Sequence, residues 1–263
     1  MIQHQILYAL MGTGITFAGT ILGASLVFFF KKGVKPNIQK GFLGFAAGVM
    51  IAASVWSLLI PAMEMASSQG QAPILSAALG FAGGGIFFIL VDRILPHLHP
   101  GSKIPEGIPT KMKRTTMLVL AVTLHNIPEG MAVGLTFALA AQSTGSTALS
   151  GAMALAIGMA LQNFPEGAAI SLPLKNEGFS RPKAFLYGAL SGIVEPIAAV
   201  ITVLIAGSVA VVMPWLLAFA AGAMIFVVSE DLIPECSDRN SHLGTIGVMF
   251  GFLIMMVLDV TMG

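Results

Sequence analysis

The sequence predicts an all-α polytopic membrane protein with eight transmembrane helices, and three observations support this fold class. First, 56% of the 263 residues are hydrophobic and only 10% are charged, whereas a soluble domain carries about 25% charged residues. Second, apolar runs of about 18 residues or more follow one another along the whole chain. Third, all 13 lysines and arginines lie at or between the facing ends of runs 1 and 2, 3 and 4, 5 and 6, and 7 and 8, which places them on one side of a membrane.

The eight expected spans are separated by short polar connections. Each is long enough to cross a hydrocarbon core about 30 Å thick at about 1.5 Å per residue. No stretch of soluble-domain composition interrupts them, so residues 1–263 are expected to form a single transmembrane domain, with 96–113 as the loop between the third and fourth spans. In order, the spans cover roughly 5–30, 41–65, 73–95, 114–141, 147–172, 183–207, 211–233 and 242–262.

The basic residues predict the orientation of the chain. They lie between spans 1 and 2, 3 and 4, 5 and 6, and 7 and 8, while the loops near 66–72, 142–146 and 208–213 have none. Lysine and arginine accumulate on the cytoplasmic side of membrane proteins. We therefore expect both termini outside the cytoplasm and the loop 96–113 inside it, in an integral protein of the plasma or inner membrane.

Other features exclude several classes of protein. The start MIQHQ has no basic residue and the first span is too long for a signal peptide, so this span is expected to remain in the protein. A single cysteine, Cys236, excludes an intrachain disulfide and a cysteine-based zinc cluster. A net charge of +1 gives no indication of nucleic-acid binding. The expected partner is the lipid bilayer that surrounds the spans.

Two pairs of segments repeat within the chain. LHNIPEGMA at 124–132 matches LQNFPEGAA at 161–169, in spans 4 and 5. FAAGVMI at 45–51 matches FAAGAMI at 219–225, in spans 2 and 7, and each copy is followed by an LIP tripeptide. In both pairs the partners cross the membrane in opposite directions. This predicts an inverted-topology repeat with span pairs 1/8, 2/7, 3/6 and 4/5, although pairs 1/8 and 3/6 show no clear sequence similarity.

The motif shared by spans 4 and 5 carries metal-ligating groups. His125 and Glu129 are four residues apart, as are Gln162 and Glu166. Each pair therefore lies on one face of its helix, a turn apart. Imidazole, carboxylate and amide oxygen together form an N/O ligand set suited to a divalent metal such as zinc.

The same motif contains residues that shape its helices. A proline inside a helix removes one backbone donor and clashes one turn back, so Pro128 and Pro165 are expected to kink spans 4 and 5. Carbonyl groups freed in this way are tolerated at such depth only beside protein, water or a bound ion. Gly130 and Gly167 permit a close helix approach, by which the two copies of the motif are expected to meet.

Distances along the helices place the motif near the middle of the membrane. His125 lies 11 residues beyond Arg114, or about 16 Å along the helix. Glu166, Glu195 in the SGIVEP segment of span 6, and Met50 in span 2 lie at similar depth. A charge at the bilayer centre costs about 2.5–3.5 kcal/mol, and no lysine or arginine is expected at that depth. A divalent cation would neutralise the glutamates; the alternative is a hydrogen-bonded polar seam that joins the helices.

These residues resemble the ZIP (Zrt/Irt-like) family of divalent-metal transporters. The pair HNIPEG and QNFPEG on adjacent central spans, the SGIVEP of the next span and eight spans with both termini outside are similar to that family over essentially the whole chain. The isoleucine of HNIPEG is most similar to the GufA-like branch. The resemblance implies uptake of zinc and related ions toward the cytoplasm through a midmembrane site, with no enzymatic activity and no prosthetic group.

The resemblance also implies two adjacent metal positions that Glu129 and Glu166 bridge. The first position comprises Met50, His125, Glu129, Gln162 and Glu166, and the second comprises Asn126, Glu129, Asn163, Glu166 and Glu195. Some family members have an aspartate where this chain has Asn163. The neutral amide weakens the second position, so the sequence leaves open whether the site binds one ion or two.

Acidic residues nearer the two surfaces extend the implied path. Glu64 and Asp259 lie near the outer ends of spans 2 and 8 and resemble entrance residues. Asp92 and Glu230 lie near the cytoplasmic ends of spans 3 and 7 and resemble exit-side ligands. Each of these carboxylates is equally typical of a solvated helix end.

The loop 96–113 carries two histidines in the segment PHLHPG. His97 and His99 are similar to a reduced version of the longer His-rich loop of many ZIP proteins. We interpret them as a weak capture site for metal, with an ordinary mobile loop as the alternative.

Three functions are compatible with buried carboxylates in a membrane domain. Import of divalent metal by alternating access is favoured by the twin motif and the repeat, with zinc ahead of iron, manganese, cobalt and cadmium. A proton- or cation-coupled carrier of another substrate would use the buried carboxylates as a proton relay, but a relay has no need of amides. An intramembrane metalloenzyme is disfavoured because the zinc-protease string HExxH is absent. A homodimer is compatible with all three.

Overall fold

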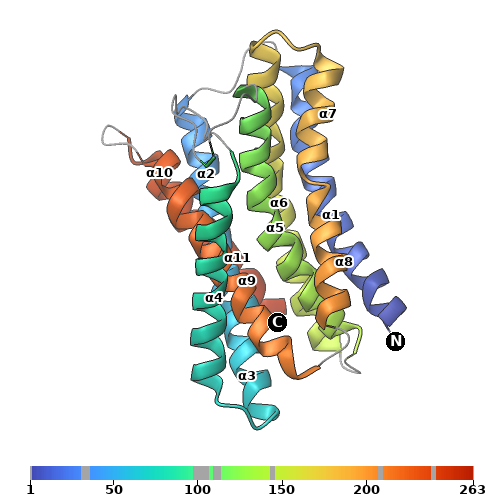
Figure 1. Ribbon diagram of the computed structural model, residues 1–263. Coiled ribbons are helices and arrows are strands. Elements are labelled where there is room, and N and C mark those ends of the chain that lie inside the picture. The colour runs from blue at the N-terminus through green and yellow to red at the C-terminus, as the bar shows by residue number, and fades with distance from the viewer. Residues whose placement is uncertain are drawn as a thin grey trace.

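The computed structural model describes residues 2–30, 36–96, 107–108, 114–142, 146–206, 210–237 and 241–262, and all regular structure within these ranges is helical (Figure 1). This confirms the all-α fold class. The elements are α1 (Ile2–Phe29), α2 (Pro36–Ala53), η1 (Ser54–Leu59), α3 (Ile60–Ser68), α4 (Pro73–Ile94), α5 (Arg114–Ala140), α6 (Ser146–Asn176), α7 (Arg181–Ser191), α8 (Val194–Ala206), η2 (Ala210–Val212), α9 (Met213–Val227), η3 (Val228–Leu232), α10 (Ile233–Cys236) and α11 (Leu243–Met262).

These elements form eight long segments that match the expected spans to within several residues. Among the described residues, seven segments are long and apolar enough to cross a membrane. The eighth, α5, carries the HNIPEG motif and is not one of these seven. Its 27 residues are nevertheless sufficient for a core about 30 Å thick at about 1.5 Å per residue.

Spans 2 and 7 contain matching π-helical turns. η1 begins nine residues after the start of FAAGVMI, and η3 begins nine residues after the start of FAAGAMI. Each turn leads into an Ile-Pro pair, where a residue after the turn donates to the carbonyl five positions back, Ile60 to Val55 and Ile233 to Val228. Single π turns of this kind occur mostly inside α-helices and frequently at functional sites. The sequence similarity of these two segments therefore extends to an uncommon local structure.

Span 6 is broken, contrary to the continuous helix expected over 183–207. α7 ends at Ser191, Gly192 and Ile193 form a turn, and α8 begins at Val194. The sequence explains the position of the break, because Pro196 has no N–H to donate and its ring clashes with the carbonyl four residues back, at Gly192. Glu195 consequently lies in the first turn of a new helix.

Pro128 and Pro165 do not interrupt their helices in this way. α5 and α6 continue through them as α-helix from end to end.

The helices pack in two groups, which Figure 1 shows side by side. One group contains α1 and α5 to α8, and the other contains α2 to α4 and α9 to α11. The closest packing in the first group is α1 with α6 and α5 with α8; in the second it is α2 with α11 and α4 with α9. Glycines make these contacts possible: a Cβ at Gly23 would strike the carbonyl of Phe164, and a Cβ at Gly84 would strike the carbonyl of Phe219.

The two motif glycines also make close helix contacts, but with different partners from those expected. A Cβ at Gly130 of α5 would strike the backbone of Glu195 in α8, and a Cβ at Gly167 of α6 would strike the backbone of Thr20 in α1. The expectation that these glycines bring the two motif copies against one another was therefore wrong. They instead hold α8 and α1 against the motif helices.

Candidate metal centre

Three helices bring the central polar residues together. α5 carries Asn126 and Glu129, α6 carries Gln162 and Asn163, and the first turn of α8 carries Glu195. None of these five side chains is more than 1% exposed. The close contact of Gly130 with the backbone of α8 brings Glu195 to the same level as the α5 motif.

A chain of hydrogen bonds joins Glu129 to Glu195. Nε2 of Gln162 donates to Oε1 of Glu129 at 2.5 Å and to Oδ1 of Asn163 at 3.0 Å. Nδ2 of Asn163 donates to Oε1 of Glu195 at 2.8 Å and to the carbonyl of Thr16 at 3.2 Å. The Thr16 hydroxyl donates to Oε2 of Glu195. We call Thr16, Glu129, Gln162, Asn163 and Glu195 the central network.

Several oxygens around the central network accept no hydrogen bond from the described part of the chain. They are Oδ1 of Asn126, Oε2 of Glu129, Oε1 of Gln162 and Oε2 of Glu166. Buried polar atoms are hydrogen-bonded in most proteins, and each exception calls for an explanation such as an ion or a water. Four such oxygens on two facing helices form a set of acceptors without donors, which is the arrangement that a cation would satisfy.

His125 points to a different partner from Glu129. Its Nε2 lies 2.7 Å from Oδ2 of Asp231, which lies in η3 of the second helix group. His125 and Asp231 also line a small cavity together with Asp92 of α4. Glu235 of α10 acts electrostatically on the same histidine. The expected exit-side residue Asp92 is thus close to His125, and two acidic residues that the sequence analysis did not name are there as well.

Among the described residues, no group of three or more His, Cys, Asp or Glu side chains is arranged to hold one metal ion. The reason is visible in the contacts: His125 is held by Asp231, and the amides of Gln162 and Asn163 lie between Glu129 and Glu195. A metal bound by both His125 and Glu129 would require His125 to leave Asp231.

Two buried methionines of the apolar core bear on the expected sulfur ligand. Met50 of α2, the residue expected from the sequence, is fully buried. Met159 of α6 belongs to the same core, and its Sδ accepts a hydrogen bond from Nε2 of Gln162 at 3.6 Å.

The remaining motif residues lie at the edges of the network. Nδ2 of Asn126 donates to the carbonyl of Ser191, at the end of α7. Glu166 is 7% exposed and lines a cavity between α6 and α2. The broken span 6 is therefore tied to the motif on both sides of its break, through Asn126 before it and Asn163 after it.

The two expected entrance residues line one cavity. Glu64 and Asp259 both face a cavity of about 510 Å³, together with Ser57, Thr136 and other side chains. The hydroxyl of Ser57 donates to Oδ1 of Asp259 at 2.6 Å. Ser57 lies in the π turn η1, so this turn contributes a polar side chain to the cavity.

Glu230 is the second of the two residues expected on the exit side. Glu230 has an exposed side chain, whereas its neighbour Asp231 is 5% exposed and faces His125. His97 and His99 lie outside the described residues. The sequence did contain a signal for the missed pair, because Asp231 and Glu235 flank Pro234 at the same four-residue spacing as His125 and Glu129.

The sequence is similar to a family of transporters. The family model described as ZIP Zinc transporter matches residues 109–259. Zinc transporter ZIP11 of Homo sapiens is 38% identical, with 99% of this chain and 99% of that protein covered. Zinc transporter ZIPB of Bordetella bronchiseptica is 38% identical over 97% of this chain and 82% of its own length. Zinc transporter GufA of Myxococcus xanthus is 37% identical over 96% of this chain and 100% of its own length.

Proposed function

Because the chain belongs to the ZIP family of zinc transporters, we propose that it imports divalent metal ions into the cytoplasm through the central network, with zinc as the main substrate. The protein is an integral membrane transport protein and not an enzyme. Iron, manganese, cobalt and cadmium are further proposed substrates, because N/O ligand sets bind several first-row divalent metals and their relatives.

The observation that carries this proposal is the set of unpartnered oxygens on Asn126, Glu129, Gln162 and Glu166. A polar seam that only joined helices would pair its acceptors, because each buried acceptor without a donor costs about 1–3 kcal/mol. Divalent cations bound between α5 and α6 would pair with these acceptors. The acceptors belong to both copies of the twin motif, as expected for a metal held between α5 and α6.

In the metal-bound state, Glu129 and Glu166 are proposed as the shared ligands of two adjacent positions. His125, Gln162 and Met50 would complete the first position, and Asn126, Asn163 and Glu195 the second. Asn163 is already bonded to Glu195 and Thr16, so filling the second position would require these bonds to rearrange, just as filling the first would require His125 to leave Asp231.

We further propose alternating access between the two helix groups, based on an inverted repeat. The matching π turns of spans 2 and 7 support this repeat. The packing favours span pairs 1/6, 2/7, 3/8 and 4/5 over the pairs 1/8 and 3/6 expected from the sequence. If span 1 is exchanged with span 6 and span 4 with span 5, the contact of spans 1 and 5 (α1 with α6) becomes that of spans 6 and 4 (α8 with α5). If span 2 is exchanged with span 7 and span 3 with span 8, the contact of spans 2 and 8 (α2 with α11) becomes that of spans 7 and 3 (α9 with α4).

The proposed path begins at the cavity of Glu64 and Asp259 and ends near Asp92 and Asp231. The basic residues between spans support a cytoplasmic position for the second end and an outer position for both termini. In this proposal residues 1–263 act as one transporter unit in the plasma or inner membrane, with 96–113 as a cytoplasmic loop.

Zinc uptake into proteoliposomes tests the proposal. Glu129→Gln and Glu166→Gln keep the size of each side chain and remove its charge, so uptake should fall at least about tenfold in each, as expected when a metal ligand or its support is lost. Glu177→Gln, at the exposed turn after α6, is the matched control and should transport normally. Normal zinc uptake by both motif variants would contradict the proposal. Transport of another solute by the purified protein in a chelator would favour the proton-coupled carrier instead.

A further inference from the structure

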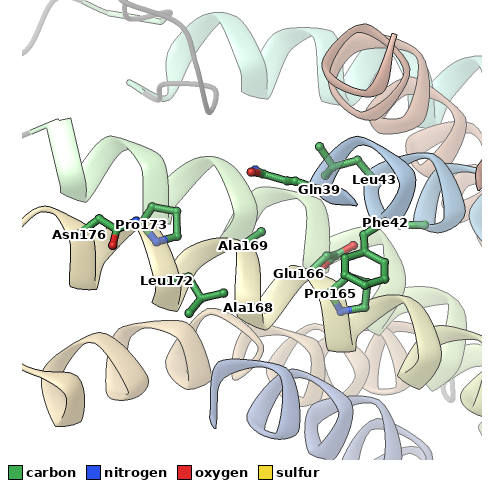
Figure 2. Close-up of a pocket in the computed structure, with 11 residues that line it drawn as sticks. Gln39, Phe42, Leu43, Pro165, Glu166, Ala168, Ala169, Leu172, Pro173 and Asn176 are labelled. Atoms are coloured by element: carbon green, nitrogen blue, oxygen red, sulfur yellow. The ribbon is translucent and has the colours of Figure 1, made fainter. Parts of the chain in front are cut away.

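A cavity of about 80 Å³ lies between α2 and α6, beside the central network. Figure 2 shows Glu166 and Phe42 at one end and Asn176 at the other, with Gln39 and Leu43 on the α2 side. Glu166 and Asn176 are ten residues apart on one helix, so the cavity lies along about 15 Å of α6.

The cavity combines apolar walls with one buried carboxylate. Its walls include Phe42, Leu43, Leu172 and several alanines and prolines. Glu166 is 7% exposed, and its Oε2 accepts no hydrogen bond from the described residues. Among the described residues, the other polar side chains of the lining are Gln39 and Asn176, and Asn176 is exposed at the far end.

This lining does not suit a metal ion outside the central network. A divalent metal requires about four to eight donor atoms, whereas the cavity offers one carboxylate and two amides, and Asn176 lies at the opposite end from Glu166. A primary ammonium group is a compact charge with three donors, and its methylene stem packs well against apolar surface. The walls and the carboxylate together fit such a molecule.

We propose that this cavity binds small primary alkylammonium ions, with the ammonium group at Glu166 and the alkyl chain between Phe42 and Leu172. The small volume limits the chain to a few carbons, so n-butylammonium is the appropriate probe. Because Glu166 is also a proposed metal ligand, an occupied cavity competes with zinc uptake; this consequence rests on the proposed function, whereas binding itself does not.

Binding is measured first, without metal. The full chain in lipid nanodiscs with a chelator is titrated with n-butylammonium and, separately, with n-butanol, which has the same alkyl chain but no charge. Saturation-transfer NMR should detect butylammonium at concentrations at least about tenfold lower than butanol, since a charge-assisted hydrogen bond is stronger than a neutral one. Equal binding of the two probes would overturn the proposal.

Variants then test the location of the site. Glu166→Gln should weaken butylammonium binding by about tenfold or more. Ala169→Leu narrows the cavity and should move the preferred chain from butyl toward ethyl, while Phe42→Ala opens it and should move the preference toward hexyl. Leu161→Ala, on α6 but outside the cavity lining, is the matched control and should bind as the unchanged chain does. An unchanged chain-length preference in both size variants would overturn the site even if Glu166→Gln fails to fold.

Zinc uptake with increasing n-butylammonium separates this inference from the proposed function. Inhibition that zinc overcomes supports both. Butylammonium binding that leaves zinc uptake unchanged overturns the competition, and uptake that depends on Glu166 in a chain that binds no butylammonium overturns the alkylammonium site alone.

Discussion

His125 and Asp231 are hydrogen-bonded at 2.7 Å across the boundary between the two helix groups. Glu129, one turn along α5, is bonded instead to Gln162 within its own group. His125 and Glu129, four residues apart in the HNIPEG motif, thus bind partners in different helix groups. His125 joins the two groups that alternating access would move apart.

Asp231→Asn should strengthen zinc binding and slow transport. The substitution weakens the bond that holds His125 away from Glu129, and hydrogen bonds to charged groups contribute about 1.5–3 kcal/mol, so the apparent affinity should rise about tenfold. Release should slow because an acidic group on the proposed exit path is lost. Initial uptake rates over a range of zinc concentrations should therefore show a lower KM and a lower Vmax.

Glu230→Gln is the control for this prediction. Its carboxylate is adjacent in the chain but exposed, so both constants should stay unchanged. If Glu230→Gln impaired uptake and Asp231→Asn did not, the exit residue would be the one first expected from the sequence.

Asn163→Asp should destabilise the metal-free protein and increase the number of metals bound. The amide donates to Glu195 and Thr16, and an aspartate would lose both bonds and face the glutamate with like charge. The melting temperature in chelator should fall by about 2–4 °C for each kcal/mol lost, and saturating zinc should restore it. Elemental analysis should find more zinc per chain than in the unchanged protein, and an equal metal content would argue against a second position at Asn163.

The sequence predicted the helices and their motifs more completely than the contacts between them. Apolar length and basic connections were sufficient for the spans, because the membrane thickness constrains both. The side-chain partner of His125 depends on how α5 is rotated against a helix about a hundred residues further along the chain, and no local pattern encodes that rotation. Pro196 is a local signal for the break at Gly192, and the single span predicted over 183–207 did not take it into account.

Gly167→Ala should separate α1 from α6. The added Cβ would meet the backbone of Thr20, which cannot rotate away, and overpacking of this kind costs about 1–3 kcal/mol. Thermal unfolding in detergent should show a lower melting temperature. Gly14→Ala is the matched control, because a Cβ at Gly14 meets nothing within 4 Å; equal losses in both variants would mean that the contact is not responsible.

Asp259→Asn should raise the KM for zinc without changing Vmax. Asp259 lines the outer cavity and accepts a hydrogen bond from Ser57, so its charge would attract metal before the central network is reached. Uptake should fall at low zinc and recover at high zinc. Thr261→Ala, on the exposed face of the same helix, should have no effect, and a fall in Vmax alone would place Asp259 after entry rather than before it.

Pro196→Ala should reduce transport while leaving the protein at least as stable. An alanine at 196 supplies the N–H that the proline lacks and removes the ring that clashes with the carbonyl of Gly192. α7 and α8 could then join into one helix, which would rotate Glu195 away from Asn163 and Thr16 and remove it from the central network. Pro196 lies in the first turn of α8, where its replacement breaks no helical bond. The broken helix thus stays available to the variant and the joined helix forms only if it is at least as stable, so the melting temperature should be equal or higher.

Pro182→Ala distinguishes this effect from the loss of any proline. Pro182 lies in the first turn of α7, where a missing N–H breaks no helical bond, so zinc uptake and melting temperature should match the unchanged chain. A stable Pro196→Ala protein with full zinc uptake would show that the broken helix is not needed to position Glu195. Lost uptake in a protein of equal or greater stability would instead assign the break a role in transport, because a variant that merely damaged the fold would lose both.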